Sequence, residues 1–363
     1  MKLVRILKRV KPLFFDGDEL IVAKNQKIFR LGTDGKLRIL FSFENSLLYR
    51  VLEYFNLIFR LRRAGIYTSC KYHSNYYFCY QKKLFRFDVI EKQITLEKYF
   101  SQGHGPLQFC CVDSLSGFED GVYFGEYFGN ADKDEISIFQ RKPDGQWVTV
   151  YTFPKGIINH IHALVPDRKN KCIWILVGDH GSSASIWRAT DCFNDVVCIK
   201  GDNQQYRSCV AFPTEKGLLY ATDTQYEENH IRLLELVEGD WRSKEIFPIN
   251  GSCIFGCELK DYYIFSTSTE PAVGGQQSKI KQLFDSKPGP GILHNASYVV
   301  ACKKNDFSCK VVYSREKDFL PYRLFQFGTI MFPNGSSKSN QLFAYNVGSK
   351  SCDLSTETWE IDF

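Results

Sequence analysis

Residues 160–200 read HIHALVPDRKNKCIWILVGDHGSSASIWRATDCFNDVVCIK and contain four short strand patterns in a row. Apolar, β-branched and aromatic residues dominate each pattern, and turn residues separate them, as expected of adjacent antiparallel strands. The expected strands cover residues 162–165, 172–177, 185–188 and 196–199. This stretch therefore predicts one four-stranded antiparallel unit.

The same unit recurs on both sides of this stretch, at a period of about 45 residues that is typical of β-propellers. Clear copies cover residues 109–151 and 208–247, and weaker copies cover 66–99 and 252–314. The last of these requires the Gly/Pro/Ser-rich stretch 270–296 to be an insertion between its second and third strands. Residues 19–43 and 322–363 each show only three strands.

Two incomplete ends can close a propeller if residues 1–7 supply the outer strand of the last unit. Leu3, Arg5 and Leu7 should then face one way and Val4 and Ile6 the other, with both faces of the strand buried. This arrangement gives seven four-stranded blades, with six as the alternative, and leaves only short protected edges. Aromatic residues make up 15% of the chain, with 30 Phe and 20 Tyr, a composition that favours strands. We therefore predict an all-β, single-domain β-propeller over residues 1–363.

Residues 44–64 break the strand pattern between the first two blades. Their apolar residues follow a helical spacing, which predicts one amphipathic helix. The apolar positions are Leu48, Val51, Leu52, Phe55, Ile58 and Phe59. Two interpretations stay open: the helix packs on the propeller while Arg60, Arg62 and Arg63 complement its C-terminus, or residues 47–63 dock on a membrane surface or a partner protein.

The distribution of charges and cysteines limits the classes of function and the cellular compartment that can be expected. The 46 basic and 41 acidic residues are mixed along the chain, so nothing resembles the concentrated basic footprint of a nucleic-acid-binding protein. The 13 cysteines form no CxxC pair, and several lie in apolar strand patterns, so we expect free thiols in a reducing compartment. The N-terminus has no secretory pattern and no apolar run is long enough to span a bilayer, which predicts a cytoplasmic protein, with peripheral attachment at the inner membrane as an alternative.

Turns between expected third and fourth strands carry a recurring motif. Residues 141–147 read RKPDGQW, 238–241 read EGDW, 189–196 read ATDCFNDV and 32–37 read GTDGKL. These turns resemble degenerate Asp-boxes, the S-x-D-x-G-x-x-W hairpins of sialidase-like, or BNR-repeat, propellers. The resemblance implies a carbohydrate-related role of the kind associated with surface-polysaccharide metabolism. The resemblance does not extend to the three arginines with which sialidases bind the substrate carboxylate. Only Arg207 and Arg323 lie where inner strands should begin, and no third arginine completes the set.

Two sets of loops should meet around the central channel of such a propeller. Residues at or before the inner strands are His104, His160, His162, Gln205 and Arg207, and one carboxylate follows each of four second strands: Glu126, Asp179, Asp223 and Glu270. We expect these side chains to surround one pocket, with Tyr127 beside Glu126. In the alternative interpretation each carboxylate accepts backbone N–H bonds within its own loop.

Two chemistries fit these residue types. Facing carboxylates could act as acid and base on a glycosidic bond. Alternatively, His160 and His162, two apart on a strand, could bind a divalent metal with His104 and Glu126, and a lyase could remove a proton next to a uronate carboxylate. No G-x-S-x-G elbow or activated cysteine supports nucleophilic catalysis.

The sequence thus predicts a glycoside hydrolase or polysaccharide lyase acting on a surface-type or acidic glycan or its precursor. The alternative is a non-catalytic scaffold that binds glycan or protein. The expected catalytic residues are Glu126, Asp179, Asp223, His162 and Arg207. The expected substrate-binding residues are His104, Gln205, Glu270 and Tyr127, and the expected metal ligands are His160 and His162.

Overall fold

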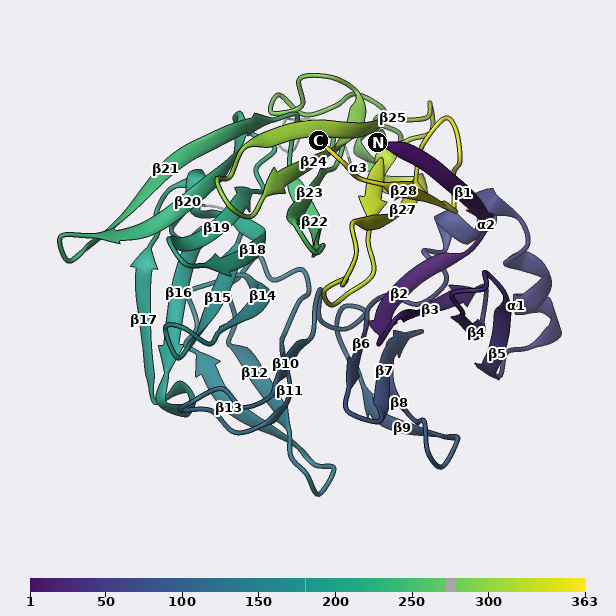
Figure 1. The fold of residues 1–363 in the computed structure, drawn as a ribbon, viewed down its shortest axis with the longest axis horizontal. Coiled ribbons are helices and arrows are strands. Elements are labelled where there is room, and N and C mark those ends of the chain that lie inside the picture. The colour runs from purple at the N-terminus through teal and green to yellow at the C-terminus, as the bar shows by residue number, and fades with distance from the viewer. Residues whose placement is uncertain (180, 272–278) are drawn as a thin grey trace. The chain divides into compact units, whose positions relative to one another are not determined.

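A computed structural model describes residues 1–179, 181–271 and 279–363. Within these residues the strands form seven four-stranded antiparallel sheets, the blades of a β-propeller (Figure 1). The prediction of seven blades is confirmed, and the six-bladed alternative is wrong. The chain divides into two compact units, one of Met1–Ile66, Thr224–Asn229 and Phe247–Phe363 and one of Tyr67–Asp223 and His230–Ile246.

The first unit holds three blades and the helices. One blade consists of β2 (Lys11–Asp16), β3 (Glu19–Lys24), β4 (Lys27–Leu31) and β5 (Leu37–Ser42). Another consists of β22 (Cys253–Glu258), β23 (Tyr262–Thr267), β24 (Ala296–Lys303) and β25 (Cys309–Glu316). The third consists of β26 (Thr329–Met331), β27 (Gln341–Val347), β28 (Ser355–Glu360) and β1 (Lys2–Lys8). The helices are α1 (Leu47–Leu52), α2 (Asn56–Leu61), α3 (Lys279–Leu283) and α4 (Tyr322–Phe325).

The second unit holds four blades. Their strands are β6 (Ser69–Tyr72), β7 (Asn75–Tyr80), β8 (Lys83–Asp88) and β9 (Gln93–Tyr99); β10 (Cys110–Val112), β11 (Gly121–Gly125), β12 (Ile136–Arg141) and β13 (Trp147–Phe153); β14 (His160–Asp167), β15 (Cys172–Gly178), β16 (Ser185–Thr190) and β17 (Asp195–Lys200); and β18 (Ser208–Thr214), β19 (Gly217–Thr222), β20 (Asn229–Val237) and β21 (Asp240–Ile249). In this unit β14 contacts both β10 and β18, so the first strands of successive blades lie side by side.

The cores lie between neighbouring blades. Every residue of β15 is buried because both faces of this strand are covered, which explains its continuous apolar run. Trp174 of β15 packs with Tyr220 of β19 in one such core. The indole nitrogen of Trp174 donates a hydrogen bond to Asp167 Oδ2 at 3.0 Å, so the buried polar group is satisfied.

The N-terminal strand completes the last blade, as predicted. β1 pairs antiparallel with β28, from Lys2 opposite Glu360 to Lys8 opposite Ser355. The expectation that both faces of β1 are buried is wrong, because Leu3, Val4 and Ile6 are 41%, 50% and 43% exposed. A register shift between Leu3 and Arg5 also breaks the expected alternation.

In four blades, the first strand contains one extra residue that has no partner on the second strand. The register shifts at the second or third residue of β2, β14, β18 and β22, where Leu13, His162, Cys209 and Ile254 are the inserted residues. Such bulges bend a strand and re-aim side chains. His162 and Cys209 therefore occupy equivalent positions in neighbouring blades.

Both predicted insertions are where the sequence placed them, but their internal structure differs. The single helix expected over 44–64 consists of two six-residue helices, α1 and α2. The insertion expected over 270–296 joins β23 to β24 and contains α3, while its residues 272–278 lie outside the described part of the chain. Among the described helices, none has the length and apolar character needed to cross a bilayer.

One cysteine pair corrects the expectation of free thiols throughout. Cys302 and Cys309 lie directly opposite each other on β24 and β25 and form a disulfide. The other eleven cysteines, all within the described residues, form no disulfide. The free-thiol expectation is therefore wrong for this pair, while the cytoplasmic assignment stays a prediction.

Burial of Lys11 predicts a pH dependence of stability. Its ammonium group donates to the Ile66 carbonyl oxygen at 2.8 Å in a pocket that Phe59 and Met331 also line, and burial lowers its pKa from 10.5 to about 8. Between these values the unfolded chain binds the proton and the folded chain does not, so the free energy of unfolding should rise with pH. Denaturant titrations at pH 7.5 to 10.5 should show this rise, relative to a Lys11→Met variant that lacks it. Parallel pH profiles for the two proteins would contradict the expectation.

Candidate functional site

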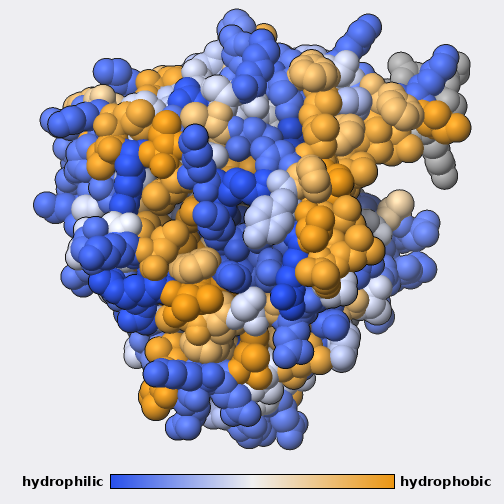
Figure 2. All heavy atoms as spheres, turned by 90° about the vertical axis from the view of Figure 1, so that its right-hand side faces the viewer, coloured by the Kyte–Doolittle hydropathy of each residue, from blue (hydrophilic) through white to orange (hydrophobic). Residues whose placement is uncertain are grey.

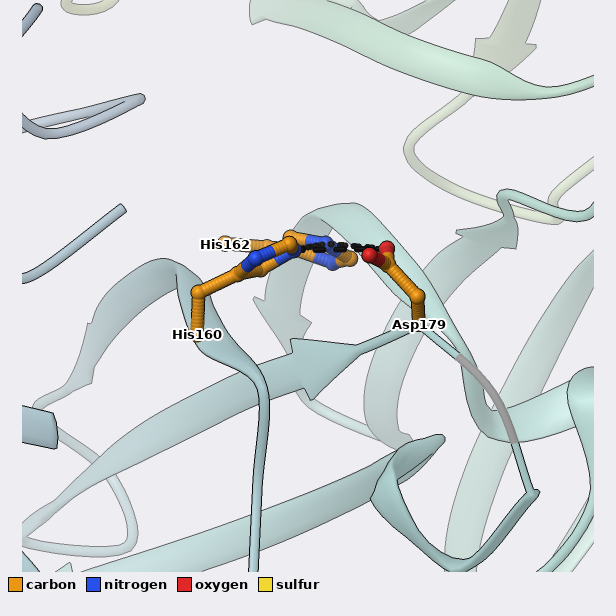
Figure 3. Close-up of side chains that lie close together, drawn as sticks. All are labelled: His160, His162 and Asp179. Atoms are coloured by element: carbon orange, nitrogen blue, oxygen red, sulfur yellow. Dashed lines mark hydrogen bonds and ion pairs between the residues drawn. The ribbon is translucent and has the colours of Figure 1, made fainter. Parts of the chain in front are cut away.

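Two histidines at the start of β14 lie side by side in the second unit (Figure 3). His160 and His162 are 6% and 2% exposed, and their Nε2 atoms are 3.0 Å apart. Their spacing in the sequence predicts that they share a face, and the bulge at His162 aims its ring toward that of His160. The Nε2 atoms of the two imidazoles therefore lie next to each other.

Backbone carbonyls determine which ring nitrogens carry the protons. His160 Nδ1 lies 3.0 Å from Phe128 O and His162 Nδ1 lies 2.9 Å from Ser208 O. A carbonyl oxygen only accepts, so both Nδ1 atoms must donate. In the neutral rings both Nε2 atoms then carry lone pairs, and these lone pairs face each other at 3.0 Å. A cation, either a proton or a metal ion, is needed between them.

Asp179 adds a third acceptor at this point. It directly follows β15, and its Oδ1 lies 3.3 Å from His160 Nε2 and 3.7 Å from His162 Nε2 (Figure 3). Arg207 Nη2 also approaches the same oxygen at 3.1 Å. Burial alone would raise the pKa of Asp179, but the neighbouring imidazoles and the Arg207 guanidinium hold it well below its usual value. The carboxylate is therefore ionised throughout the physiological range.

The backbone of Gly178, the last residue of β15 and the one before Asp179, lies close to the imidazole of His162. A Cβ atom on Gly178 would lie 2.5 Å from His162 Cε1 and 3.3 Å from Arg207 Cγ. No side chain fits at that distance, so a glycine is required for the backbone to pass between the two residues. Asn159 Oδ1 accepts a hydrogen bond from the Asp179 N–H at 3.2 Å and holds the turn from the other side.

Arg207 and Asp223 continue the cluster into the neighbouring blade. Arg207 Nε lies 3.4 Å from Asp223 Oδ2, and the Cys209 thiol donates to the same oxygen at 3.2 Å. Asp223 is 3% exposed, and its Oδ1 has no hydrogen-bond partner within the described residues. A buried carboxylate oxygen of this kind is an acceptor available to a ligand proton or a cation.

Tyr127 joins the histidines to a cavity of about 260 Å³. Its ring centroid lies 4.6 Å from that of His160, and Tyr127 also lines the cavity with Glu126 and Lys98. Burial above all, and then neighbouring acidic groups, raise the pKa of Tyr127 well above its usual value, so its hydroxyl stays protonated. Glu126 Oε2 accepts a hydrogen bond from the Ser137 N–H at 2.9 Å, which matches the loop-capping alternative.

The remaining predicted residues lie elsewhere. His104 is exposed and packs against Tyr67, with ring centroids 5.6 Å apart. Gln205 is half-buried, and its backbone oxygen accepts from the Tyr220 hydroxyl at 2.9 Å. Glu270 is buried in the first unit, and its backbone oxygen accepts from the Gly289 N–H.

Two residues of the cluster were missed by sequence reasoning. Gln204 Nε2 donates to the backbone oxygen of Asp179 at 2.9 Å, so Gln204 and not Gln205 supports this loop. Cys209 lies in an apolar strand pattern, which gives no reason to expect a polar contact, but its thiol donates to Asp223 Oδ2. Its position two residues after Arg207 in an inner strand was the available signal.

The donor set fits a divalent metal. Nε2 of His160, Nε2 of His162 and Oδ1 of Asp179 lie within 4.8 Å of one another, and each Nδ1 is oriented by a carbonyl, the arrangement typical of metal-bound histidines. Mixed imidazole and carboxylate ligands suit Mn, Fe or Zn. A second group of the same kind, His162, Cys209 and Asp223, shares one histidine with the first. The expected partners His104 and Glu126 are replaced by Asp179 in the first group.

Comparison with solved structures identifies propellers of the same fold. No protein-family model and no curated protein matches the chain. The CNH domain of AfRom2 matches with a TM-score of 0.54 and 9% identity, covering 100% of this chain and 98% of that domain. An oligogalacturonate lyase from Vibrio parahaemolyticus matches with a TM-score of 0.55 and 9% identity, covering 98% and 89%.

A third similar structure is an oligogalacturonate lyase in complex with manganese, with a TM-score of 0.56 and 8% identity, covering 97% of this chain and 89% of that chain. At these identities the likeness shows a shared fold alone. The chain is thus similar over nearly its whole length to propellers of different kinds, and the fold does not choose among their functions.

Proposed function

We propose that this protein is a divalent-cation-dependent, carbohydrate-active propeller that cleaves an acidic glycan by β-elimination. The observation that carries the proposal is the convergence of His160 Nε2, His162 Nε2 and Asp179 Oδ1, with both Nδ1 atoms held by carbonyls. The proposal is supported by fold similarity to oligogalacturonate lyases, one of them in complex with manganese.

His160, His162 and Asp179 would hold the cation. A divalent cation there supplies positive charge that neutralises a substrate carboxylate and so acidifies the adjacent C–H bond. Arg207 keeps Asp179 ionised and in position through its 3.1 Å contact. In the elimination, the C5 proton passes to a water molecule acting as the base, the C4–O bond breaks, a C4–C5 double bond forms, and the leaving oxygen takes up a proton. Tyr127 stays protonated beside the cluster and is our assignment for the donor of that proton.

The geometry favours a lyase over a hydrolase. A glycosidase needs two carboxyl groups on either side of the scissile bond. Glu126 is bound to the Ser137 N–H within its own loop, and Asp223 is 3% exposed and paired with Arg207. Asp179 alone among these three shares an oxygen with the histidine pair.

A non-catalytic scaffold is the second candidate. Its support is that the expected ring of open carboxylates is absent at Glu126 and Asp223, both of which are engaged by neighbouring groups. A propeller of the mitotic checkpoint complex also shares the fold, with a TM-score of 0.53 and 8% identity, covering 100% of this chain and 95% of that chain.

The test is an elimination assay on purified protein stripped with a chelator and reloaded with Mn²⁺. Oligogalacturonate and other oligouronates serve as substrates, and ultraviolet absorbance reports the new double bond. We expect absorbance to grow with Mn²⁺ and to be lost by about two orders of magnitude in Asp179→Asn, since the variant removes an anionic ligand. A His104→Ala variant is the matched control.

Three other results would contradict the proposed metal-dependent elimination. New reducing ends without double-bond absorbance would mean hydrolysis. Retention of an oligouronate without any product would favour the scaffold. Equal activity in the presence of excess chelator would contradict the metal dependence.

A further inference from the structure

The helical insertion of the first unit leaves many of its apolar side chains exposed, although Phe59 packs against the core. No residue of α1 is buried, and Arg60 is the one buried residue of α2. Seven large apolar side chains of this segment are between 47% and 75% exposed: Leu47, Leu48, Val51, Tyr54, Phe55, Leu57 and Leu61. Figure 2 faces the side on which Figure 1 draws α1 and α2, and apolar atoms cover broad areas of it. We call these seven residues the apolar face.

Buried charges hold the insertion in this orientation. Arg60 is 2% exposed, donates to the Phe325 carbonyl oxygen at 2.8 Å, and forms ion pairs with Asp318 and, at 3.4 Å, Asp353. A fully buried guanidinium needs such partners, so rotating α2 to bury its apolar side chains would break them at high cost. The orientation is therefore a property of the fold.

The other end of the insertion is held by polar contacts as well. Arg9 Nη1 donates to the Tyr54 carbonyl oxygen at 3.0 Å and also contacts Asn56 Oδ1, and Arg9 Nη2 donates to the Glu53 carbonyl oxygen. These contacts reach the turn between α1 and α2 from the backbone side. Tyr54 and Phe55 are left at 70% and 57% exposure.

Exposed charges around the apolar face are mostly basic. Within residues 44–63 the exposed charged side chains are Arg50, Arg62, Arg63 and Glu44. The three arginines against one glutamate give this surface a net positive charge. Arg62 stacks over the Tyr49 ring at 4.1 Å, which places its guanidinium beside the helices.

We propose that the apolar face docks on the surface of an anionic lipid bilayer. Exposed aliphatic and aromatic side chains on short helices, flanked by arginines, match the features of peripheral membrane-binding segments. The positive charge is complementary to anionic headgroups. Each helix has six residues, so the segment lies on the bilayer and does not span it. Exposed apolar side chains insert among acyl chains without needing matching pockets, and the flanking arginines are complementary to anionic headgroups, which favours lipid over a protein partner.

The experiment is co-sedimentation of the full chain with vesicles of phosphatidylcholine, with or without phosphatidylglycerol. We expect binding to the anionic vesicles, weakened by salt and at least about tenfold stronger than to the neutral ones. A Phe55→Ser/Leu57→Ser double variant should lose about tenfold in partition coefficient. Ile90→Ser is the matched control, because Ile90 is 74% exposed in the second unit and outside the apolar face.

A second variant reports insertion directly. Phe55→Trp should show a blue shift of tryptophan emission when anionic vesicles are added, in excess of any shift of the unmodified protein. Equal binding to neutral and anionic vesicles, unchanged binding of the double variant, or no emission shift would each overturn the proposal. A dimer in lipid-free solution that dissociates in the double variant would also overturn it, because the apolar face would then be an interface between two copies.

Discussion

Deleting residues 1–8 should lower the melting temperature by roughly 5–10 °C, although no residue of the candidate site is touched. β1 pairs with β28 from Lys2 to Lys8, and removing it takes away the backbone hydrogen bonds of the outermost strand pair. At about 1 kcal/mol per hydrogen bond, the loss is about 5 kcal/mol. The contribution of side chains is smaller, because Leu3, Val4 and Ile6 are 41–50% exposed and only Leu7 packs against the core.

Calorimetry of the truncated and full-length chains measures this effect. The deletion also leaves β28 as an unpaired edge, so the truncated protein should aggregate on heating at lower concentration than the full-length chain. A Val4→Ser/Ile6→Ser double variant is the control, since it keeps the strand and changes exposed side chains; its melting temperature should move by no more than about 2 °C. An unchanged melting curve for the truncated chain would rule out a stabilising role for β1.

The repeat was readable from the sequence because its strands are short, separated by turn residues and spaced evenly. β15 and β19 stand out as continuous apolar runs because both faces of a second strand are covered by neighbouring blades. The bulges were not readable, because one extra residue in a strand changes no local pattern. The bulge at His162 is nevertheless what aims this side chain.

The candidate site was predicted in part. His160, His162, Asp179 and Arg207 meet because the first strands and the residues after the second strands of neighbouring blades lie together in the second unit. The positions of the carboxylates in the sequence could not show which of them accept hydrogen bonds within their own loops. Glu126 follows its strand as Asp179 does, but the Ser137 N–H binds its side chain.

The orientation of the helical insertion could not be predicted. Helical spacing identifies which residues share one side of a helix, but it does not show what that side contacts in the folded protein. The residues that decide the orientation are Asp318 and Asp353, which lie about 260 and 290 positions from Arg60 along the chain. Contacts at such separations depend on the assembled fold and leave no local signal.

Replacing His162 with alanine is expected to weaken Mn²⁺ binding by about 100-fold or more. His162 belongs to both groups of candidate ligands, so its loss should remove a ligand wherever the ion binds. Isothermal titration of chelator-treated protein, with metal content checked by mass spectrometry, measures the affinity. Because His162 is 2% exposed, thermal melting must show that the variant is folded, and His162→Gln provides a second variant of closer volume.

Two further variants locate the ion. His160→Gln should weaken binding as strongly as His162→Ala if the ion lies among His160, His162 and Asp179, whereas Cys209→Ser should leave the affinity unchanged. The opposite pattern would place the ion among His162, Cys209 and Asp223. If the unmodified protein binds no divalent metal, the facing Nε2 atoms must instead share a proton. In that case nitrogen NMR should show one imidazolium in the pair, because both Nδ1 atoms already donate to carbonyl oxygens.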